Sequence, residues 1–86
     1  IQTEHIDAVE RADEIYSVPG IDAVFVGPND LAASMRSPDG SPPDKELFER
    51  TLTRIREACH RQKVAAGLHT FSIDSARKRV AEGWQF

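Results

Sequence analysis

The chain has 86 residues, of which 40% are hydrophobic, and its formal net charge is −3 at pH 7. This length allows one domain, and the weakly acidic balance argues against nucleic acid or an anionic membrane surface as a partner. The single cysteine, Cys59, cannot form an internal disulfide, and no apolar run reaches the roughly 20 residues of a membrane span. The composition therefore predicts a cytoplasmic protein with neither a membrane nor a nucleic acid partner.

Both ends of the chain have the composition of strands. The first residues, Ile1 to Glu4, are partly β-favouring, and the last three, Trp84 to Phe86, form an aromatic run with no polar segment after it. Natural domains usually end in exposed polar segments. We therefore expect residues 1–86 to be a single partial domain of a longer protein.

A helix is predicted directly after the first strand end. From His5 the apolar residues recur with the helical period, and the expected inward stripe consists of Ala8, Ala12 and Ile15, flanked by Val9 and Tyr16. This helix is predicted to stop at residues 17–20, Ser-Val-Pro-Gly, because proline removes a backbone donor and glycine admits a left-handed turn.

Residues 21–26 form the clearest predicted strand. Their continuous apolar run is typical of a strand that is buried on both faces of an α/β fold, and we expect Val24 and Val26 to point toward the interior of a barrel. The strand ends abruptly in a turn, Gly27-Pro28-Asn29-Asp30, and a short helix is expected from Leu31. Residues 36–43 are dense in turn formers and predict a loop.

The second half of the chain predicts a long helix, a short strand and another helix. Asp44 is the expected N-cap of a helix that reaches about Gln62, with an apolar stripe of Phe48, Leu52, Ile55 and Cys59. Residues 64–68 predict a second buried strand. Ser72 is the expected cap of a helix that ends at Glu82-Gly83 and points inward with Ile73, Ala76 and Val80. A further strand is expected to begin at Trp84.

Strands that alternate with helices predict an α/β fold with a parallel sheet and crossover helices. Units of this length would make about half of a (β/α)₈ TIM barrel, so residues 1–86 are interpreted as roughly four β/α units, truncated in the last strand. The competing architecture is a doubly wound open sheet, but the glycine-rich phosphate fingerprint of that fold is missing here.

Polar residues follow three of the predicted strands. Glu4 follows the first, Asn29 and Asp30 follow the second, and His69 follows the third. In parallel barrels the functional side chains lie at such strand ends. Two carboxylates on neighbouring strand ends repel each other unless a proton or cation lies between them, and hard divalent cations prefer oxygen ligands. The alternative is that Glu4 and Asp30 only cap the helices that follow them.

Four stretches, IQTE, VPGIDAVFVGPNDLAASM, KVAAGL and AEGWQF, resemble the C-terminal half of the HpcH/HpaI aldolase family, an α/β barrel family of the phosphoenolpyruvate/pyruvate type. The most specific of the shared features is the Gly-Pro-x-Asp-Leu turn after an apolar strand. The resemblance implies a class II aldolase that depends on a divalent cation (Mg²⁺, Mn²⁺ or Co²⁺), with Glu4 and Asp30 as the metal ligands. It also implies a homo-oligomer for the full-length protein.

The same resemblance implies roles for the turn after the second strand. Gly27 and Pro28 would shape the turn so that backbone amides near Asn29 and Asp30 meet the substrate carboxylate, helped by the start of the short helix. The side chain of Asn29 is expected to stabilise the turn itself. His69 departs from the family, which commonly has an apolar residue there; it either touches the substrate or is a satisfied polar side chain at the barrel mouth.

The implied activity is cleavage or formation of 4-hydroxy-2-oxo acids via a pyruvate enolate, with small 2-keto acids and aldehydes as substrates. Examples are 4-hydroxy-2-oxoheptanedioate and 2-dehydro-3-deoxy sugar acids. No catalytic proton-transfer residue is assigned to this chain, because the family's His–Asp pair and enolate-binding Arg belong to the N-terminal half; the isolated chain is expected to be inactive. The alternatives are an enzyme of the citrate lyase or malyl-CoA lyase kind and a non-catalytic half-barrel that acts through association.

Overall fold

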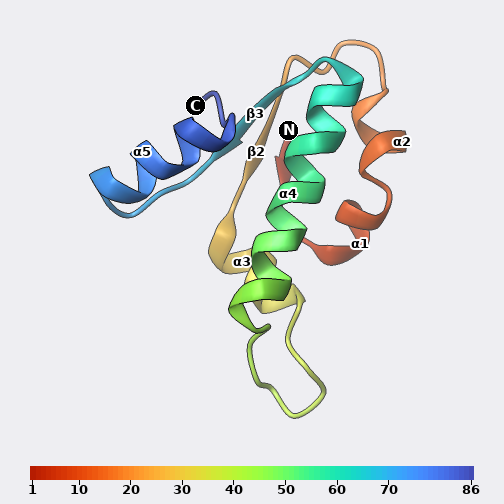
Figure 1. Ribbon diagram of the computed structural model, residues 1–86. Coiled ribbons are helices and arrows are strands. Elements are labelled where there is room, and N and C mark those ends of the chain that lie inside the picture. The colour runs from red at the N-terminus through yellow and green to blue at the C-terminus, as the bar shows by residue number, and fades with distance from the viewer.

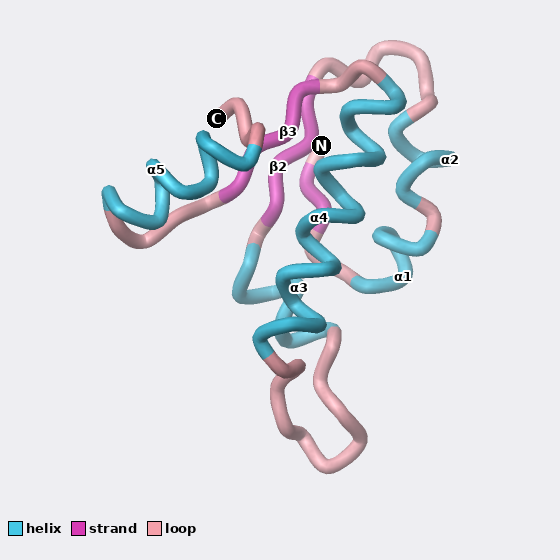
Figure 2. Tube along the Cα trace, viewed as in Figure 1, coloured by secondary structure: helices cyan, strands magenta, loops and turns pink.

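The computed structural model describes all 86 residues and contains a three-stranded parallel sheet in the order β1-β2-β3. The strands are β1 (Gln2–Thr3), β2 (Ala23–Val26) and β3 (Ala65–Leu68). The helices are α1 (Ile6–Glu10), α2 (Ala12–Tyr16), α3 (Pro28–Ser34), α4 (Lys45–Gln62) and α5 (Ile73–Glu82). Parallel strands with crossover helices are thus confirmed (Figures 1 and 2). None of the helices combines the length and apolar character needed to cross a membrane.

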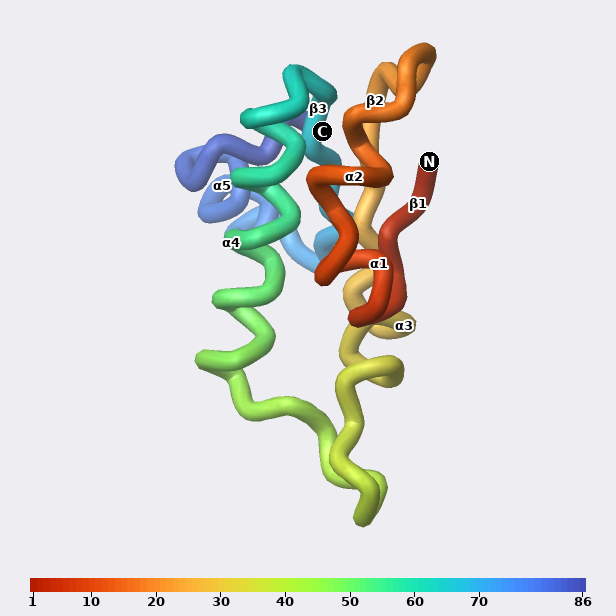
Figure 3. Tube along the Cα trace, turned by 90° about the vertical axis from the view of Figure 1, so that its right-hand side faces the viewer, coloured from red at the N-terminus to blue at the C-terminus, as the bar shows by residue number.

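The helices cover the sheet unevenly. In Figure 1, α1, α2 and α4 are grouped together, whereas α5 lies apart from them beyond β3. The predicted loop of residues 36–43 connects α3 to α4 and extends away from the sheet, as Figure 3 also shows. This loop leaves the molecule at the end where α3 begins, which is the end at which β2 finishes.

The two faces of the sheet differ in burial. By register, one row of side chains that point toward the helices consists of Thr3, Val26 and Leu68, and all of them are buried. The adjacent row, on the opposite face, consists of Gln2, Phe25 and Gly67. The prediction that Val24 and Val26 point to a barrel interior is therefore wrong. Side chains alternate along a strand, so the two valines share the face that the helices cover. The side chains on the opposite face of β2, Ala23 and Phe25, are only half-buried.

The segment after β1 forms two short helices instead of one. The backbone of Arg11 leaves the helical conformation, with φ −103° and ψ 18°, and separates α1 from α2. The buried stripe consists of Val9, Ala12 and Tyr16. The prediction was right for Ala12, but Val9 and Tyr16, which were expected to flank the stripe, take the places of Ala8 and Ile15. The Tyr16 and Thr3 hydroxyls share a hydrogen bond of 2.8 Å in the core. Burial raises the pKa of Tyr16 to about 12.

Helix α4 begins and packs as predicted. The carboxylate of Asp44 accepts a hydrogen bond of 2.7 Å from the Leu47 amide, which caps the first turn. Leu52, Ile55 and Cys59 are buried in the core, and Phe48 is half-buried against it. Burial also raises the pKa of the Cys59 thiol to about 11. This cysteine is therefore a small core residue and not a reactive nucleophile.

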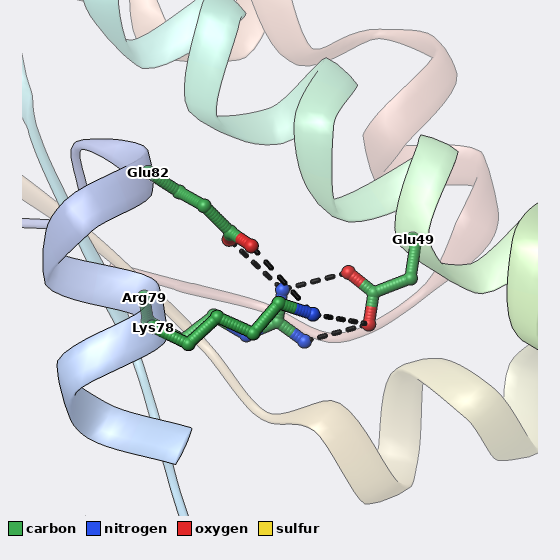
Figure 4. Close-up of polar contacts among 4 residues, drawn as sticks. All are labelled: Glu49, Lys78, Arg79 and Glu82. Carbon is green, nitrogen blue, oxygen red and sulfur yellow. Dashed lines mark hydrogen bonds and ion pairs between the residues drawn. The ribbon is translucent and has the colours of Figure 1, made fainter. Parts of the chain in front are cut away.

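Helix α5 has the predicted ends but not the predicted packing. Ser72 caps its start and Gly83 its end, yet Ile73 and Val80 are 73% and 67% exposed, so the prediction that this stripe points inward is wrong. No residue of α5 is buried. Polar contacts hold it instead: Arg79 and Lys78 reach toward Glu49 of α4, as Figure 4 shows.

The last residues run beside β3. The Gln85 amide donates to the Ala66 carbonyl at 2.8 Å, and the Leu68 amide donates to the Phe86 carbonyl at 3.0 Å. This pairing supports the predicted start of a further strand at Trp84, although residues 84–86 do not form a regular strand and the Ala66 amide donates to the Gln85 side chain. The Phe86 ring covers Gly67, where any side chain would collide with it, and stacks on Phe25 with a centroid distance of 6.1 Å.

Candidate functional site

The carboxyl ends of the three strands bring the predicted site residues to one edge of the sheet. Glu4 follows β1, Gly27 follows β2 and His69 follows β3. The last paired residues of these strands are in register with one another, so these three positions lie at one level. Asp30 lies three residues beyond Gly27, in the first turn of α3.

The Glu4 carboxylate lies against the backbone of Gly27. A Cβ atom at position 27 would be only 2.8 Å from Glu4 Oε2 and 3.1 Å from Gln2 Nε2. Gln2 Nε2 also donates a hydrogen bond of 2.8 Å to Glu4 Oε2. The carboxylate therefore occupies a space that only glycine leaves free, and the Gln2 amide orients it.

Asp30 is presented by a rigid turn. Pro28 stands at the first helical position of α3, where its fixed φ favours the helix and its missing N–H costs nothing. Leu31, fully buried, anchors the same helix in the core. Asp30 itself is exposed, and its carboxylate accepts no hydrogen bond from the protein. Its oxygens are free to meet a ligand.

The helix-capping alternative is contradicted for both carboxylates. His5, and not Glu4, caps α1, because its Nδ1 accepts a hydrogen bond of 3.2 Å from the Asp7 amide. Gly27 is the N-cap of α3, and Asp30 lies inside the helix without a capping bond. The two carboxylates therefore do not serve the local role that was considered for them.

These residues fit a hard divalent cation in their chemistry. Two carboxylates at one strand edge offer oxygen ligands, and the Gly27 seat fixes one of them. No cluster of three or more His, Cys, Asp or Glu side chains arranged for a metal is present in the chain.

The rest of the turn offers backbone donors. The Leu31 amide donates to the Gly27 carbonyl at 3.0 Å, which closes the turn, whereas the amides of Asn29 and Asp30 have no acceptor within the protein. The Asn29 side chain is exposed and makes no hydrogen bond, so the prediction that it stabilises the turn is wrong. Pro28 and the backbone bond hold the turn without it.

His69 is exposed at the end of β3. Its backbone amide donates to the Val26 carbonyl at 3.3 Å, and its imidazole packs edge-on against the Phe71 ring at 4.7 Å between centroids. The imidazole makes no hydrogen bond to the protein, so it is not the satisfied polar side chain that was considered. Its contact with substrate remains a prediction.

His5 and Asp7 resemble a proton-transfer pair in composition but not in geometry. His5 Nδ1 lies 3.6 Å from an Asp7 carboxylate oxygen. That nitrogen already accepts the Asp7 backbone N–H, so it carries no proton to donate to the carboxylate. The pair forms a helix cap.

Two contacts at this edge were missed by the sequence analysis. Gln2 could have been found, because residues two apart on a strand share a face and Gln2 thus lies beside Glu4. Ser34 accepts a hydrogen bond from the Ile6 amide, and it joins α3 to the segment after β1. No sequence signal marks that contact.

Among curated proteins, the chain is similar to the 2-keto-3-deoxy-L-rhamnonate aldolase of Escherichia coli strain K12. The two are 40% identical over 88 residues, which cover 100% of this chain and 32% of the relative. The chain therefore spans about a third of the length of the curated relatives it matches.

Two solved structures share the fold and about a third of their sequence over the same region. An HpcH/HpaI aldolase/citrate lyase family protein from Burkholderia cenocepacia J2315 has a TM-score of 0.82 and 31% identity, with 99% of this chain and 32% of the other covered. An HpcH/HpaI aldolase from Desulfitobacterium hafniense DCB-2 has a TM-score of 0.81 and the same identity and coverage. The HpcH/HpaI aldolase/citrate lyase family itself matches residues 1–86. The chain belongs to the HpcH/HpaI aldolase/citrate lyase family.

Proposed function

We propose that the full-length protein containing residues 1–86 is a divalent-metal-dependent aldolase that cleaves or forms 4-hydroxy-2-oxo acids. The observation that carries this proposal is the pair of carboxylates at one strand edge. Glu4 is seated on Gly27 and oriented by Gln2, and Asp30 is held by a rigid turn and accepts no hydrogen bond. The 2-keto-3-deoxy-L-rhamnonate aldolase relative favours 2-keto-3-deoxy sugar acids as the substrate class.

Each group at the edge has a distinct task in this proposal. Glu4 and Asp30 hold the cation, which supplies Lewis-acid polarisation of the substrate keto group when it is bound. The free amides of Asn29 and Asp30 bind the substrate carboxylate. His69, at the end of β3, is proposed to contact the substrate beside them. Proton transfer and closure of the barrel are left to residues outside 1–86, and we expect the isolated chain to release no pyruvate.

A cleavage assay tests the proposal against the citrate lyase branch of the family. The full-length enzyme is given a 2-keto-3-deoxy sugar acid or a malyl-CoA-type thioester, each with Mg²⁺ or Mn²⁺, and pyruvate and thioester products are measured. We expect pyruvate from the keto acid alone. Cleavage of the thioester alone would favour the citrate lyase alternative, and inertness toward both would favour a non-catalytic role.

Replacing Gly27 with Ala should weaken metal binding while leaving the stability of the fold nearly unchanged. The backbone of Gly27, at φ −89° and ψ 98°, is open to alanine, and the atoms that a Cβ meets are the movable ends of Glu4 and Gln2. The free energy of unfolding should therefore change by less than about 1 kcal/mol. The displaced carboxylate should weaken Mn²⁺ binding about tenfold, by analogy with altered ligand orientation at other metal sites.

Calorimetric Mn²⁺ titration and thermal melting of the full-length Gly27→Ala variant measure the two quantities side by side. Unchanged Mn²⁺ affinity would show that the seat of Glu4 on Gly27 has no role in the site. A large drop in melting temperature would show that the residue is structural instead.

A further inference from the structure

Ser34, the last residue of α3, links the two segments that carry the candidate metal ligands. Its hydroxyl donates to the Leu31 carbonyl at 2.7 Å and accepts from the Ile6 amide at 3.0 Å. Leu31 directly follows Asp30, and Ile6 lies two residues after Glu4. A single hydroxyl therefore joins the backbone beside one carboxylate to the backbone beside the other.

This link lies where the sheet no longer connects the two segments. The β1–β2 pairing ends at Thr3 and Val26, and beyond that point one chain turns into α1 and the other into α3. The bond from the Ile6 amide to Ser34 is the only hydrogen bond that joins residues 4–10 to residues 27–35. The hydrogen bonds that hold Glu4 and Asp30 relative to each other are thus those of the β1–β2 pairing on one side and that of Ser34 on the other.

The geometry requires a hydroxyl at position 34. Both partners are backbone groups, one an acceptor and one a donor, and a serine Oγ can serve both at once. The Ile6 amide is one of the first-turn donors of α1 that have no partner within their own helix. Alanine at position 34 would remove the hydrogen bond between the two segments and leave this half-buried donor without its partner.

We propose that Ser34 is a positioning residue for the divalent-cation site and sets the separation of the Glu4 and Asp30 carboxylates. This inference rests on the proposed function. Residues that orient metal ligands without touching the metal typically change affinity about 10–100-fold when they are replaced. Ser34→Ala should therefore raise the Mn²⁺ dissociation constant of the full-length enzyme about tenfold.

The chain offers a matched control. Ser17 also ends a helix, and its hydroxyl donates to the Glu14 carbonyl at 2.7 Å, three residues back, as Ser34 does to Leu31. Ser17 makes no bond to a second segment. Ser17→Ala thus removes the same local bond without the link, and Ser34→Thr keeps the hydroxyl in place.

A second variant removes the same bond from its donor end. Ile6 stands at the first position of α1, where proline is well tolerated, and the preceding His5 has the extended backbone that proline requires. Ile6→Pro deletes the amide without changing the sequence of α3, although it also replaces a side chain that packs against the core. It should raise the Mn²⁺ dissociation constant as Ser34→Ala does, which keeps the test decisive if Ser34→Ala does not fold.

Electron paramagnetic resonance of free Mn²⁺ measures the dissociation constant for each full-length variant. We expect about a tenfold rise for Ser34→Ala and Ile6→Pro, with Ser34→Thr and Ser17→Ala within about twofold of the wild type. If both Ser34→Ala and Ile6→Pro bind Mn²⁺ with wild-type affinity while Asp30→Asn binds it weakly, the proposed role of Ser34 is overturned and the metal site is not. Wild-type affinity in Asp30→Asn would overturn the metal site itself, and the role of Ser34 with it.

Discussion

If Glu4 and Asp30 bind the cation as proposed, replacing Asp30 with Asn in the full-length protein is expected to weaken Mn²⁺ binding by about a hundredfold or more, since even residues that only orient metal ligands cost about 10–100-fold. The substitution keeps the size of the side chain and removes its charge. The Asp30 carboxylate is exposed and accepts no hydrogen bond in the protein, so no internal contact is lost with it. Thermal stability should therefore stay near that of the wild type while the affinity, measured by calorimetry, falls.

The neighbouring residue supplies the control for this prediction. Asn29 is exposed in the same turn, carries no charge and makes no side-chain hydrogen bond, so Asn29→Ala should leave Mn²⁺ affinity within about twofold. Glu4→Gln should behave like Asp30→Asn. Equal affinities in Asp30→Asn and Asn29→Ala would show that Asp30 is not a ligand of the proposed metal site.

Local signals in the sequence predicted the helix ends well. Asp44 and Ser72 cap α4 and α5 as expected, because capping depends only on a side chain and the amides two or three residues after it. The face of a strand is harder to predict. A continuous apolar run such as residues 23–26 does not reveal which side each residue takes, and Val24 and Val26 were therefore placed on the wrong face.

The site was predictable to the extent that it depends on strand ends. Glu4, Asp30 and His69 follow strands in the sequence and lie at one edge of the sheet in the structure. The hydrogen bond through Ser34 joins residues 28 positions apart, and no sequence pattern in either segment predicts it. The packing of α5 also escaped prediction, since its apolar stripe at Ile73 and Val80 has no partner within these 86 residues.

Ion pairs join α5 to α4, and Arg79 makes the shortest of them. The Arg79 guanidinium donates two hydrogen bonds of 2.7 Å to the Glu49 carboxylate and one of 3.0 Å to Glu82 (Figure 4). Only 13% of the Arg79 side chain is exposed. Its hydrogen bond to Glu49 raises the pKa of Arg79, so the group stays charged throughout the accessible pH range.

Arg79→Ala should therefore loosen α5 from the rest of the protein. Hydrogen bonds to charged groups contribute about 1.5–3 kcal/mol each, which corresponds to roughly a tenfold to hundredfold faster amide hydrogen exchange in α5. Arg77, on the same helix, is exposed and makes no ion pair, so Arg77→Ala is the matched control. Equal exchange in the two variants would show that apolar contacts hold the helix after all.

Acid should have the same effect as Arg79→Ala on the wild-type protein. The hydrogen bond from Arg79 holds the pKa of Glu49 below its ordinary value of 4.5. The pKa of Glu49 is lowered only while α5 is attached to α4. The ion pair therefore stabilises the attachment fully above pH 4.5, and this stabilisation is lost as the pH falls below that value. Protection of the α5 amides, corrected for intrinsic exchange, should decline in that range in the wild type and not in Arg79→Ala. The end of β3 should keep its protection in acid, because the Leu68 and His69 amides donate to the Phe86 and Val26 carbonyls and not to α5.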